Sequence, residues 1–418
     1  MTINRRQFTA GALAFSGSFQ GLHATTQLDE SASHTIDAAL ASGSKSLGIP
    51  AVVAMVAGRD KVLYQGAFGT RDAESGVHVK TDSIFAIASM TKAITSAAAL
   101  QLVEQGKVTL TQPASRYLPE LGSLQVLVGF DTAGKPQFRA PRTPVTLRHL
   151  LTHTSGLCYD TWSAEMMQWE AATGTSLPIS SVAPHVPLIF DPGSRWQYGY
   201  SIDYAGKLVE TVSGLSLEEY FQRNLFQPLS MPDTSFIVDA QKFDRVVTGY
   251  ARQADGSLQP NPRALPQPPQ AFNGGGGLSS TVGDYVKFMQ MILRRGRSAS
   301  GQQLLKPETV AMMSTNQIGK LGAGRLKTQR PVVSGDVDLH PGAVDRWGLG
   351  FLINEVAYPG GRSAGSLAWA GVFNTFYWID PKRDLCAVIM MQYLPFVDPQ
   401  AVALLGGFER AVYSSLKT

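Results

Sequence analysis

Cysteine is scarce in this sequence. Its 418 residues include only two cysteines, Cys158 and Cys386, which lie far apart in the chain. An oxidising compartment would permit them to pair, but two thiols in a chain of this length are more often simply buried, and we expect burial here. The sequence also lacks CxxC, HExxH and calcium-loop motifs, so it predicts neither a bound metal nor a cofactor.

The sequence has little net charge and no long apolar run. Lysine and arginine number 36 against 32 acidic residues, which gives a net charge of +4. The densest basic cluster, at 294–297, is typical of a solvated helix end, so we expect no nucleic-acid partner. Outside the N-terminal segment no run approaches the roughly 18 apolar residues of a membrane-spanning helix. We therefore expect no stable membrane insertion of the mature chain.

The N-terminal segment differs in character from the rest of the chain. Arg5 and Arg6 precede a weakly apolar stretch, and Ala24 offers a small residue for cleavage. This arrangement resembles a twin-arginine export signal. We expect residues 1–24 to be a Tat-type signal peptide, residues 25–418 to form the folded domain, and the mature protein to be periplasmic or secreted. A cytoplasmic tail with a chance pair of arginines is the alternative.

Strand and helix signals are distributed unevenly along the chain. Alternating or wholly apolar runs bounded by turn residues predict strands at 49–56, 62–69, 375–379 and 385–392. Apolar positions at helical spacing predict helices at 91–104, 147–151, 203–212, 216–226, 284–295 and 400–416. Because strands lie at both chain ends, we expect an α+β fold with an antiparallel sheet built from both ends. The last helix should cover this sheet. A mostly helical second lobe should span roughly 95–290. Residues 126–144 and 253–277 are expected to be irregular loops that border a site.

Ser89 and Lys92 form an SxxK motif that carries the chemistry. Positions i and i+3 share a helix face, so the Lys92 amine can reach the Ser89 hydroxyl. A serine hydroxyl is a weak nucleophile without an adjacent base, and lysine acts as that base only when burial or nearby positive charge lowers its pKa. The apolar residues around the motif, at 84–88 and 93–94, favour such burial. A buried helix start without catalysis is the alternative interpretation.

Two further serines stand three positions before a lysine, Ser42 and Ser414. Ser42 lies in a polar stretch rich in small residues, and Ser414 lies at the chain end, where its lysine is expected to be solvated. Neither environment would lower the pKa of the lysine. Sequence context therefore favours Ser89 over both.

Four segments resemble those of a known family and follow one another in the same order. Residues 85–92 resemble the nucleophile segment of class C β-lactamases and related esterases and peptidases. Three more resemble other hallmark segments of that superfamily, at 147–157, 192–198 and 274–281. The resemblance implies a β-lactamase/transpeptidase-like fold, with Ser89 as acyl-forming nucleophile, Lys92 as its proton partner and Tyr198 as the second base. It also implies structural rather than catalytic roles for His149 and His153, which are four apart on the predicted helix.

Two departures from the β-lactamase pattern bear on the substrate. Tyr200 stands where β-lactamases and DD-peptidases carry asparagine, and Trp-Ala-Gly at 369–371 stands at the place of their Lys-Thr-Gly motif. Family VIII carboxylesterases show a similar W-x-G motif together with the spacing of Tyr198, Asp203 and Gly206 found here. Among known branches of the superfamily, the chain therefore resembles these esterases most.

Trp369, Gly371 and Val372 are the candidate substrate-binding residues. An indole cannot hold a carboxylate as the family's lysine does, and it suits an apolar acyl or alcohol group. A plain core position is the alternative for Trp369. The oxyanion hole is expected to consist of the Ser89 N–H and a second backbone N–H at Gly371 or Val372, just past a turn at 369–371.

We therefore expect a serine carboxylesterase that forms an acyl-enzyme with a small-molecule ester or amide. A β-lactamase or D-Ala-D-Ala carboxypeptidase is an alternative that the missing Lys-Thr-Gly and asparagine disfavour. An acyltransferase or amidase would use the same residues. A non-catalytic binding protein is disfavoured because Ser89, Lys92 and Tyr198 are all present. The sequence indicates neither the oligomeric state nor the physiological substrate.

Overall fold

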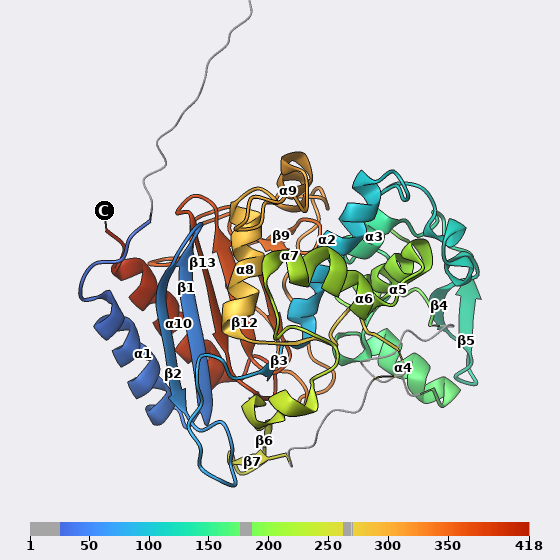
Figure 1. Ribbon diagram of the computed structural model, residues 1–418. Coiled ribbons are helices and arrows are strands. Elements are labelled where there is room, and N and C mark those ends of the chain that lie inside the picture. Colours follow the sequence, from blue (N-terminus) through green and yellow to red (C-terminus); the bar gives the residue numbers. More distant parts are fainter. Residues whose placement is uncertain (1–25, 176–185, 262–268, 270, 418) are drawn as a thin grey trace, which may run out of the picture.

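The computed structural model describes residues 26–175, 186–261, 269 and 271–417 (Figure 1). The expected signal peptide lies outside the described residues. The largest sheet has seven strands in the order β2-β1-β13-β12-β11-β10-β9, and each neighbouring pair is antiparallel. Its strands are β1 (Ala51–Gly58), β2 (Val62–Gly69), β9 (Arg346–Trp347), β10 (Leu352–Ile353), β11 (Leu367–Gly371), β12 (Thr375–Asp380) and β13 (Leu385–Met390).

Strands β1 and β13 join the two ends of the chain inside this sheet. Their register runs from Val53 opposite Met390 to Gly58 opposite Leu385. Both strands are buried along their whole length, as expected for strands that have helices on both faces. The predicted antiparallel sheet from both chain ends is confirmed, and with it the α+β fold class.

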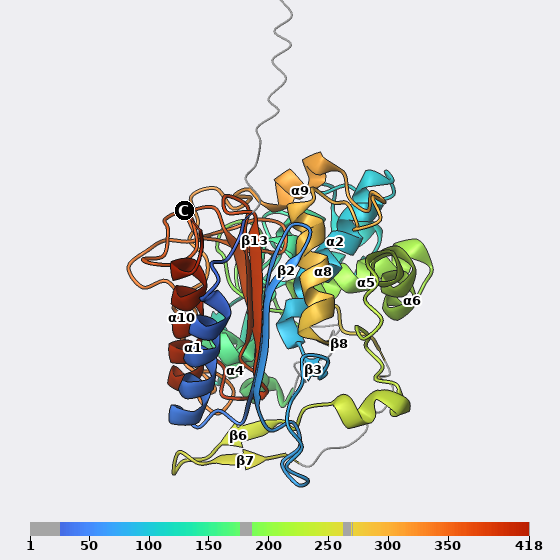
Figure 2. The same ribbon diagram turned by 60° about the vertical axis from the view of Figure 1, so that its left-hand side comes forward.

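Helices cover both faces of the sheet, which Figure 2 shows nearly edge-on. α1 (Ala32–Ser46) and α10 (Pro399–Ser414) pack together on one face. α2 (Thr91–Glu104) and α8 (Val282–Leu293) lie on the other, where α8 contacts β1 and β13. The predicted last helix corresponds to α10. Helix α1 was not predicted; its buried face consists of Ala32, Ile36, Leu40 and Ser44, so only two large apolar side chains mark it in the sequence.

Helix α2 lies between the sheet and the helices of the middle of the chain (Figure 1). Nearly all of its residues are buried because α5 (Ser201–Ser213) packs against it as well. Further helices are α3 (Leu147–Leu151), α4 (Ala164–Thr173), α6 (Leu217–Phe221), α7 (Gln227–Leu229) and α9 (Pro307–Met313), with a π-helical turn at Gln222–Phe226. Short 3-10 segments occur at Ala88–Met90, Ala114–Arg116, Pro119–Gly122, Asp160–Trp162 and Ala240–Arg245. No helix among the described residues is long and apolar enough to cross a membrane.

Smaller sheets connect the loops around this core. β3 (Phe85–Ala86) pairs with β8 (Ser279–Ser280), β4 (Val126–Phe130) pairs with β5 (Pro136–Arg139), and β6 (Tyr250–Arg252) lies between β7 (Leu258–Pro260) and β14 (Tyr393–Leu394). The β4–β5 hairpin corrects the prediction that residues 126–144 are irregular. Gly129 and Pro136 interrupt the strand signal in the sequence, whereas backbone pairing across the hairpin maintains both strands.

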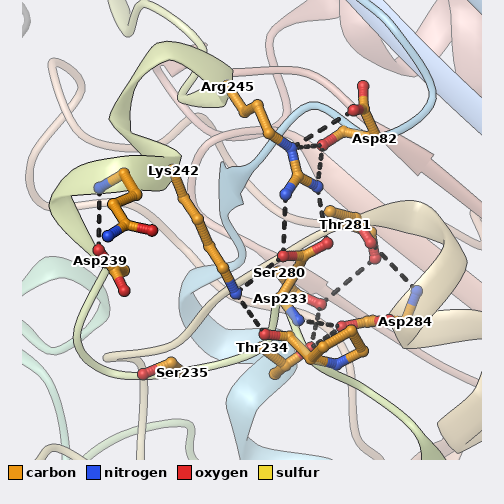
Figure 3. Close-up of polar contacts among 12 residues, drawn as sticks. Asp82, Asp233, Thr234, Ser235, Asp239, Lys242, Arg245, Ser280, Thr281 and Asp284 are labelled. Atoms are coloured by element: carbon orange, nitrogen blue, oxygen red, sulfur yellow. Dashed lines mark hydrogen bonds and ion pairs between the residues drawn. The ribbon is translucent and has the colours of Figure 1, made fainter.

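Figure 3 shows a polar cluster beside β8, at the start of α8. The Asp284 carboxylate accepts hydrogen bonds from the Asp233 amide at 2.7 Å and from the Thr234 hydroxyl at 3.2 Å. The Arg245 guanidinium donates a hydrogen bond to the carboxylate of Asp233 at 2.6 Å. Burial raises the pKa of Asp284. These contacts attach residues 233–245 to the first turn of α8.

The two cysteines are both buried, as predicted, and they are not paired with each other. Burial raises the pKa of each thiol. A raised pKa keeps a thiol protonated and unreactive, so these side chains act as small apolar groups of the core.

Candidate active site

Ser89 stands on a strained turn that leads into α2. Ala88, the residue before it, has a φ of 44°, in the left-handed region that costs a residue with a Cβ about 1–2 kcal/mol. Hydrogen bonds on both sides hold this turn: the Ile87 amide donates to the Leu278 carbonyl at 3.0 Å, and the Leu278 amide donates to the Thr91 hydroxyl at 3.2 Å. The turn brings Ser89 to the wall of a cavity.

Lys92 is fully buried and lies beside Ser89. Its Nζ is 3.2 Å from Ser89 Oγ, 3.3 Å from the Tyr159 hydroxyl and 2.5 Å from the Gly275 carbonyl. The i, i+3 spacing thus brings the amine to the hydroxyl, and the surrounding fold supplies the burial that the sequence predicts. The amine also lies 4.7 Å from the centroid of the Tyr198 ring.

Tyr198 and Trp369 meet beside Lys92, and neither is among the residues that line the cavity. The Trp369 indole Nε1 donates a hydrogen bond to the Tyr198 hydroxyl at 3.1 Å, and both side chains are buried. A neutral N–H therefore stands here, where the resemblance implies that β-lactamases have the ammonium group of the Lys-Thr-Gly lysine.

Gly371 and Val372 form the start of the β11–β12 hairpin tip. The predicted turn at 369–371 is wrong: these residues lie in strand β11, paired with β12, and the turn comes after them. The strand is too short for its alternation to be read from the sequence. A Cβ at Gly371 would lie 2.3 Å from the Ile87 carbonyl oxygen, so only glycine fits there. The tip thus lies against the segment before Ser89, and Val372 lines the same cavity as Ser89.

Asn374 fixes the shape of this tip. Its backbone has a φ of 61°, which asparagine tolerates, and its amide donates to the Gly371 carbonyl at 3.0 Å. Its side-chain Nδ2 donates to the carbonyls of Tyr393 and Pro395, each at 2.9 Å. The backbone beside Ser89 is therefore held from two directions, as an oxyanion hole requires.

The cavity beside Ser89 has a volume of about 340 Å³. Its lining is mostly apolar, with a few polar groups, which is typical of a small-molecule site. The described residues that line it are Ala88, Ser89, Tyr159, Thr161, Trp162, Asn273, Gly275, Gly276, Val333, Val372, Phe373 and Leu394. None of them is charged. The segment at 253–277, predicted to be irregular, contains strand β7, and it borders the site through its glycine-rich end.

A strap at residues 329–335 covers part of this cavity through Val333. The Gln329 amide donates to the Thr161 carbonyl at 2.8 Å, and the Trp162 indole donates to the Ser334 hydroxyl at 3.3 Å. Arg330 forms ion pairs with two buried carboxylates of the α4 region, Asp160 and Glu170. These contacts attach the strap to the wall that contains Tyr159.

Tyr159 was not predicted as a site residue, and Asp203 was noted only as part of a spacing pattern. The Tyr159 hydroxyl donates to the Asp203 carboxylate at 3.0 Å while it contacts Lys92. Burial raises the pKa of Asp203 to about 6, although Lys92 opposes the shift. Burial, together with the Asp203 charge, raises the pKa of Tyr159 well above its usual value, so Tyr159 stays protonated. The sequence signal that could have indicated Tyr159 is its position directly after the segment at 147–157.

His149 and His153 do not share a helix face, which corrects the expectation from their spacing. Helix α3 ends before His153, whose φ is 55°. The His149 ring accepts a hydrogen bond from the Thr146 amide at 3.3 Å and completes the helix cap. The His153 ring packs 4.6 Å from the Tyr198 ring, and burial lowers its pKa well below the usual value. Neither histidine lines the cavity.

The other SxxK serines lie away from this site. Ser42 is in α1 and Ser414 ends α10, the two helices on the opposite face of the sheet from α2 (Figure 2). Among the described residues, no group of three or more His, Cys, Asp or Glu side chains could hold a metal ion.

A family model described as Beta-lactamase matches residues 36–406, so the chain belongs to the beta-lactamase family. Monacolin J acid methylbutanoyltransferase from Aspergillus terreus is 34% identical in an alignment that covers 91% of this chain and 95% of that protein. Lovastatin esterase from Penicillium rubens is 32% identical and covers 84% of this chain and 91% of its own length. The structure of simvastatin synthase from A. terreus, as its LovD6 mutant, has a TM-score of 0.79 at 31% identity and covers 92% and 95% of the two chains. The β-lactamase/transpeptidase-like fold is thereby confirmed, and the family comprises serine hydrolases and acyltransferases.

Proposed function

We propose that this protein hydrolyses carboxylic esters through an acyl-enzyme on Ser89. The observation that carries the proposal is the fully buried Lys92 amine, 3.2 Å from the hydroxyl of a serine that lines an apolar cavity. A lysine amine at this distance is placed to take the proton of the serine hydroxyl. The family to which the chain belongs uses serine chemistry of this kind.

The reaction follows from the positions of these groups. The Ser89 proton passes to Lys92 as Oγ attacks the ester carbonyl carbon. The carbonyl oxygen then carries the negative charge, which the Ser89 amide and an amide at Gly371 or Val372 stabilise; each such donor contributes roughly 3–4 kcal/mol to the transition state. The alcohol leaves with a proton from Lys92. In the second half, water attacks the acyl carbon and gives a proton to Tyr198 as the second base; the bond to Ser89 Oγ breaks, that proton returns to Oγ, and the acid is released.

The cavity favours a neutral ester over a β-lactam or peptide carboxylate. None of the described residues that line it carries a positive charge. Trp369 is buried behind this lining rather than part of it, and it offers the Tyr198 hydroxyl a neutral N–H. A substrate carboxylate would therefore lose water without gaining a fixed cation, whereas an apolar acyl group gains contact with Trp162, Val333 and neighbouring residues.

Acyl transfer to an alcohol is the second candidate. It uses the same acyl-enzyme, with an alcohol in place of water as the attacking group. The 34% identity to a methylbutanoyltransferase over 91% of the chain supports it, as does an apolar cavity that suits an organic acceptor. We further propose, from Arg5 and Arg6, that the protein is exported by the Tat route to the periplasm or beyond.

Labelling with a fluorophosphonate tests the proposed function. The reagent should form one adduct, and peptide mapping by mass spectrometry should place it on Ser89. Wild-type protein should also hydrolyse p-nitrophenyl butyrate. An adduct on Ser42 or Ser414, or no adduct on the folded protein, contradicts the proposal.

A further inference from the structure

We propose that Asp203 and Tyr159 are positioning residues that point the Lys92 lone pair at Ser89, an inference that rests on the proposed serine chemistry. They belong to a buried chain of hydrogen bonds, from Ser89 Oγ to Lys92 Nζ at 3.2 Å, to the Tyr159 hydroxyl at 3.3 Å and to the Asp203 carboxylate at 3.0 Å. Three separate parts of the fold meet in it, namely the start of α2, the segment before Asp160–Trp162 and α5, and the glycine-rich loop adds the Gly275 carbonyl beside Lys92.

The direction of this chain follows from which groups can donate. To take the Ser89 proton, Lys92 must react as the neutral amine, which has two N–H bonds and one lone pair. Gly275 offers a carbonyl oxygen, which only accepts, and it lies 2.5 Å from Nζ. Tyr159 also accepts from the amine, because its single hydroxyl proton points to Asp203. Both N–H bonds are then used, and the lone pair faces the remaining partner, the Ser89 hydroxyl.

Asp203 sets the direction of these hydrogen bonds, because an ionised carboxylate can only accept them. It is buried on α5, and the glycine-rich loop is shaped around it. A Cβ at Gly275 would lie 2.2 Å from the Asp203 carboxylate, so glycine is required there. The Gly275 amide donates to the Asn273 side chain at 2.8 Å, which holds the loop and thus its carbonyl on Lys92.

Protonation of Asp203 should weaken this arrangement. The titratable groups that face it are Lys92 on α2, Tyr159 on the adjoining segment, and Tyr200 and Tyr204 on its own helix end. Burial raises the pKa of Asp203 to about 6. Below that pH the carboxyl gains a proton and can donate to Tyr159, whose own proton is then free to turn toward Lys92. Acylation should therefore fall as the pH drops through about 6, and this acidic limb should belong to Asp203.

Asp203→Asn is the direct test, because it keeps the size of the side chain and adds a donor. The asparagine Nδ2 can donate to Tyr159, which reverses the chain and lets the phenol compete with Ser89 for the lone pair. We expect kcat/KM for p-nitrophenyl butyrate and the rate of fluorophosphonate labelling to fall roughly 10- to 100-fold. The acidic limb near pH 6 should disappear in both measurements. A residue needed only for packing would lower both rates without changing their pH dependence.

Tyr159→Phe tests the same chain from its middle, and it decides the question if Asp203→Asn does not fold. It should lower the labelling rate by a similar factor. The double variant should be no slower than the slower single variant, because either change alone already breaks the one chain. Additive losses in the double variant would overturn the proposal.

Asp284→Asn is the matched control. Asp284 is also a buried carboxylate with a raised pKa, and it belongs to the cluster of Figure 3 rather than to the chain on Lys92. This variant should keep the wild-type rate and acidic limb. If folded Asp203→Asn behaves like the control, the inference is wrong while the proposed function stands. If wild-type protein neither labels on Ser89 nor cleaves esters, the proposed function itself fails.

Discussion

Replacing Trp369 with lysine changes the charge at the position where this site departs most from the β-lactamase pattern. In the wild type the indole N–H donates to the Tyr198 hydroxyl at 3.1 Å, and no described residue that lines the cavity carries a positive charge. A lysine ammonium at this place can also donate to Tyr198, and it adds a cationic partner for a substrate carboxylate. Trp369→Lys should therefore favour nitrocefin, which has a carboxylate, over a neutral ester.

The expected size of this change follows from one charge-assisted hydrogen bond. Such a bond contributes about 1.5–3 kcal/mol, which corresponds to roughly a 10- to 100-fold change in the ratio of kcat/KM values. The substitution also removes ring packing, since Trp369 lies 4.8 Å from the Trp347 ring and 4.9 Å from the Tyr198 ring. The loss of a buried tryptophan costs about 3–5 kcal/mol of stability. A thermal melt must therefore show that the variant is folded at the assay temperature.

The assay compares kcat/KM for p-nitrophenyl butyrate with kcat/KM for nitrocefin in each protein. Trp369→Phe is the control, because it keeps a ring and removes the N–H without adding charge. It should lower both values by a similar factor and leave their ratio unchanged. An unchanged ratio in folded Trp369→Lys would refute the reasoning. Wild-type turnover of penicillins near the diffusion limit would replace the esterase proposal with the β-lactamase alternative.

The remaining predictions concern the nucleophile, the acyl acceptor and export. Ser89→Ala should abolish hydrolysis of p-nitrophenyl butyrate, measured by nitrophenol release, while its melting temperature stays near that of the wild type. Adding a primary alcohol to the wild-type reaction should yield the new ester, detected by mass spectrometry; acid as the sole product at high alcohol concentration would rule out the acyltransferase candidate. A reporter that functions only when exported folded should leave the cytoplasm when fused to residues 1–30, and replacing Arg5 and Arg6 with lysine should stop it. Retention of the reporter with the native leader would contradict Tat export.

The strands and helices that sequence analysis predicted are those whose signals are local. Helix α2 begins and ends at the predicted residues, and so does strand β2, because each is a continuous segment bounded by clear turn residues. The β4–β5 hairpin and β11 were missed because they are short and contain glycine or proline. Their pairing with other strands, rather than their own pattern, makes them strands.

By itself the sequence determined that Ser89 and Lys92 lie together, because helix geometry brings positions three apart onto one face. It also determined that both chain ends contribute strands to one sheet, through runs of apolar residues that must be buried. Tertiary structure alone decided that Tyr159 and Asp203 complete the environment of Lys92, and that the Trp369 indole donates to Tyr198. These contacts join residues far apart in the chain. Local periodicity says nothing about such pairs, because their distances depend on how α2, α5 and the sheet pack against one another.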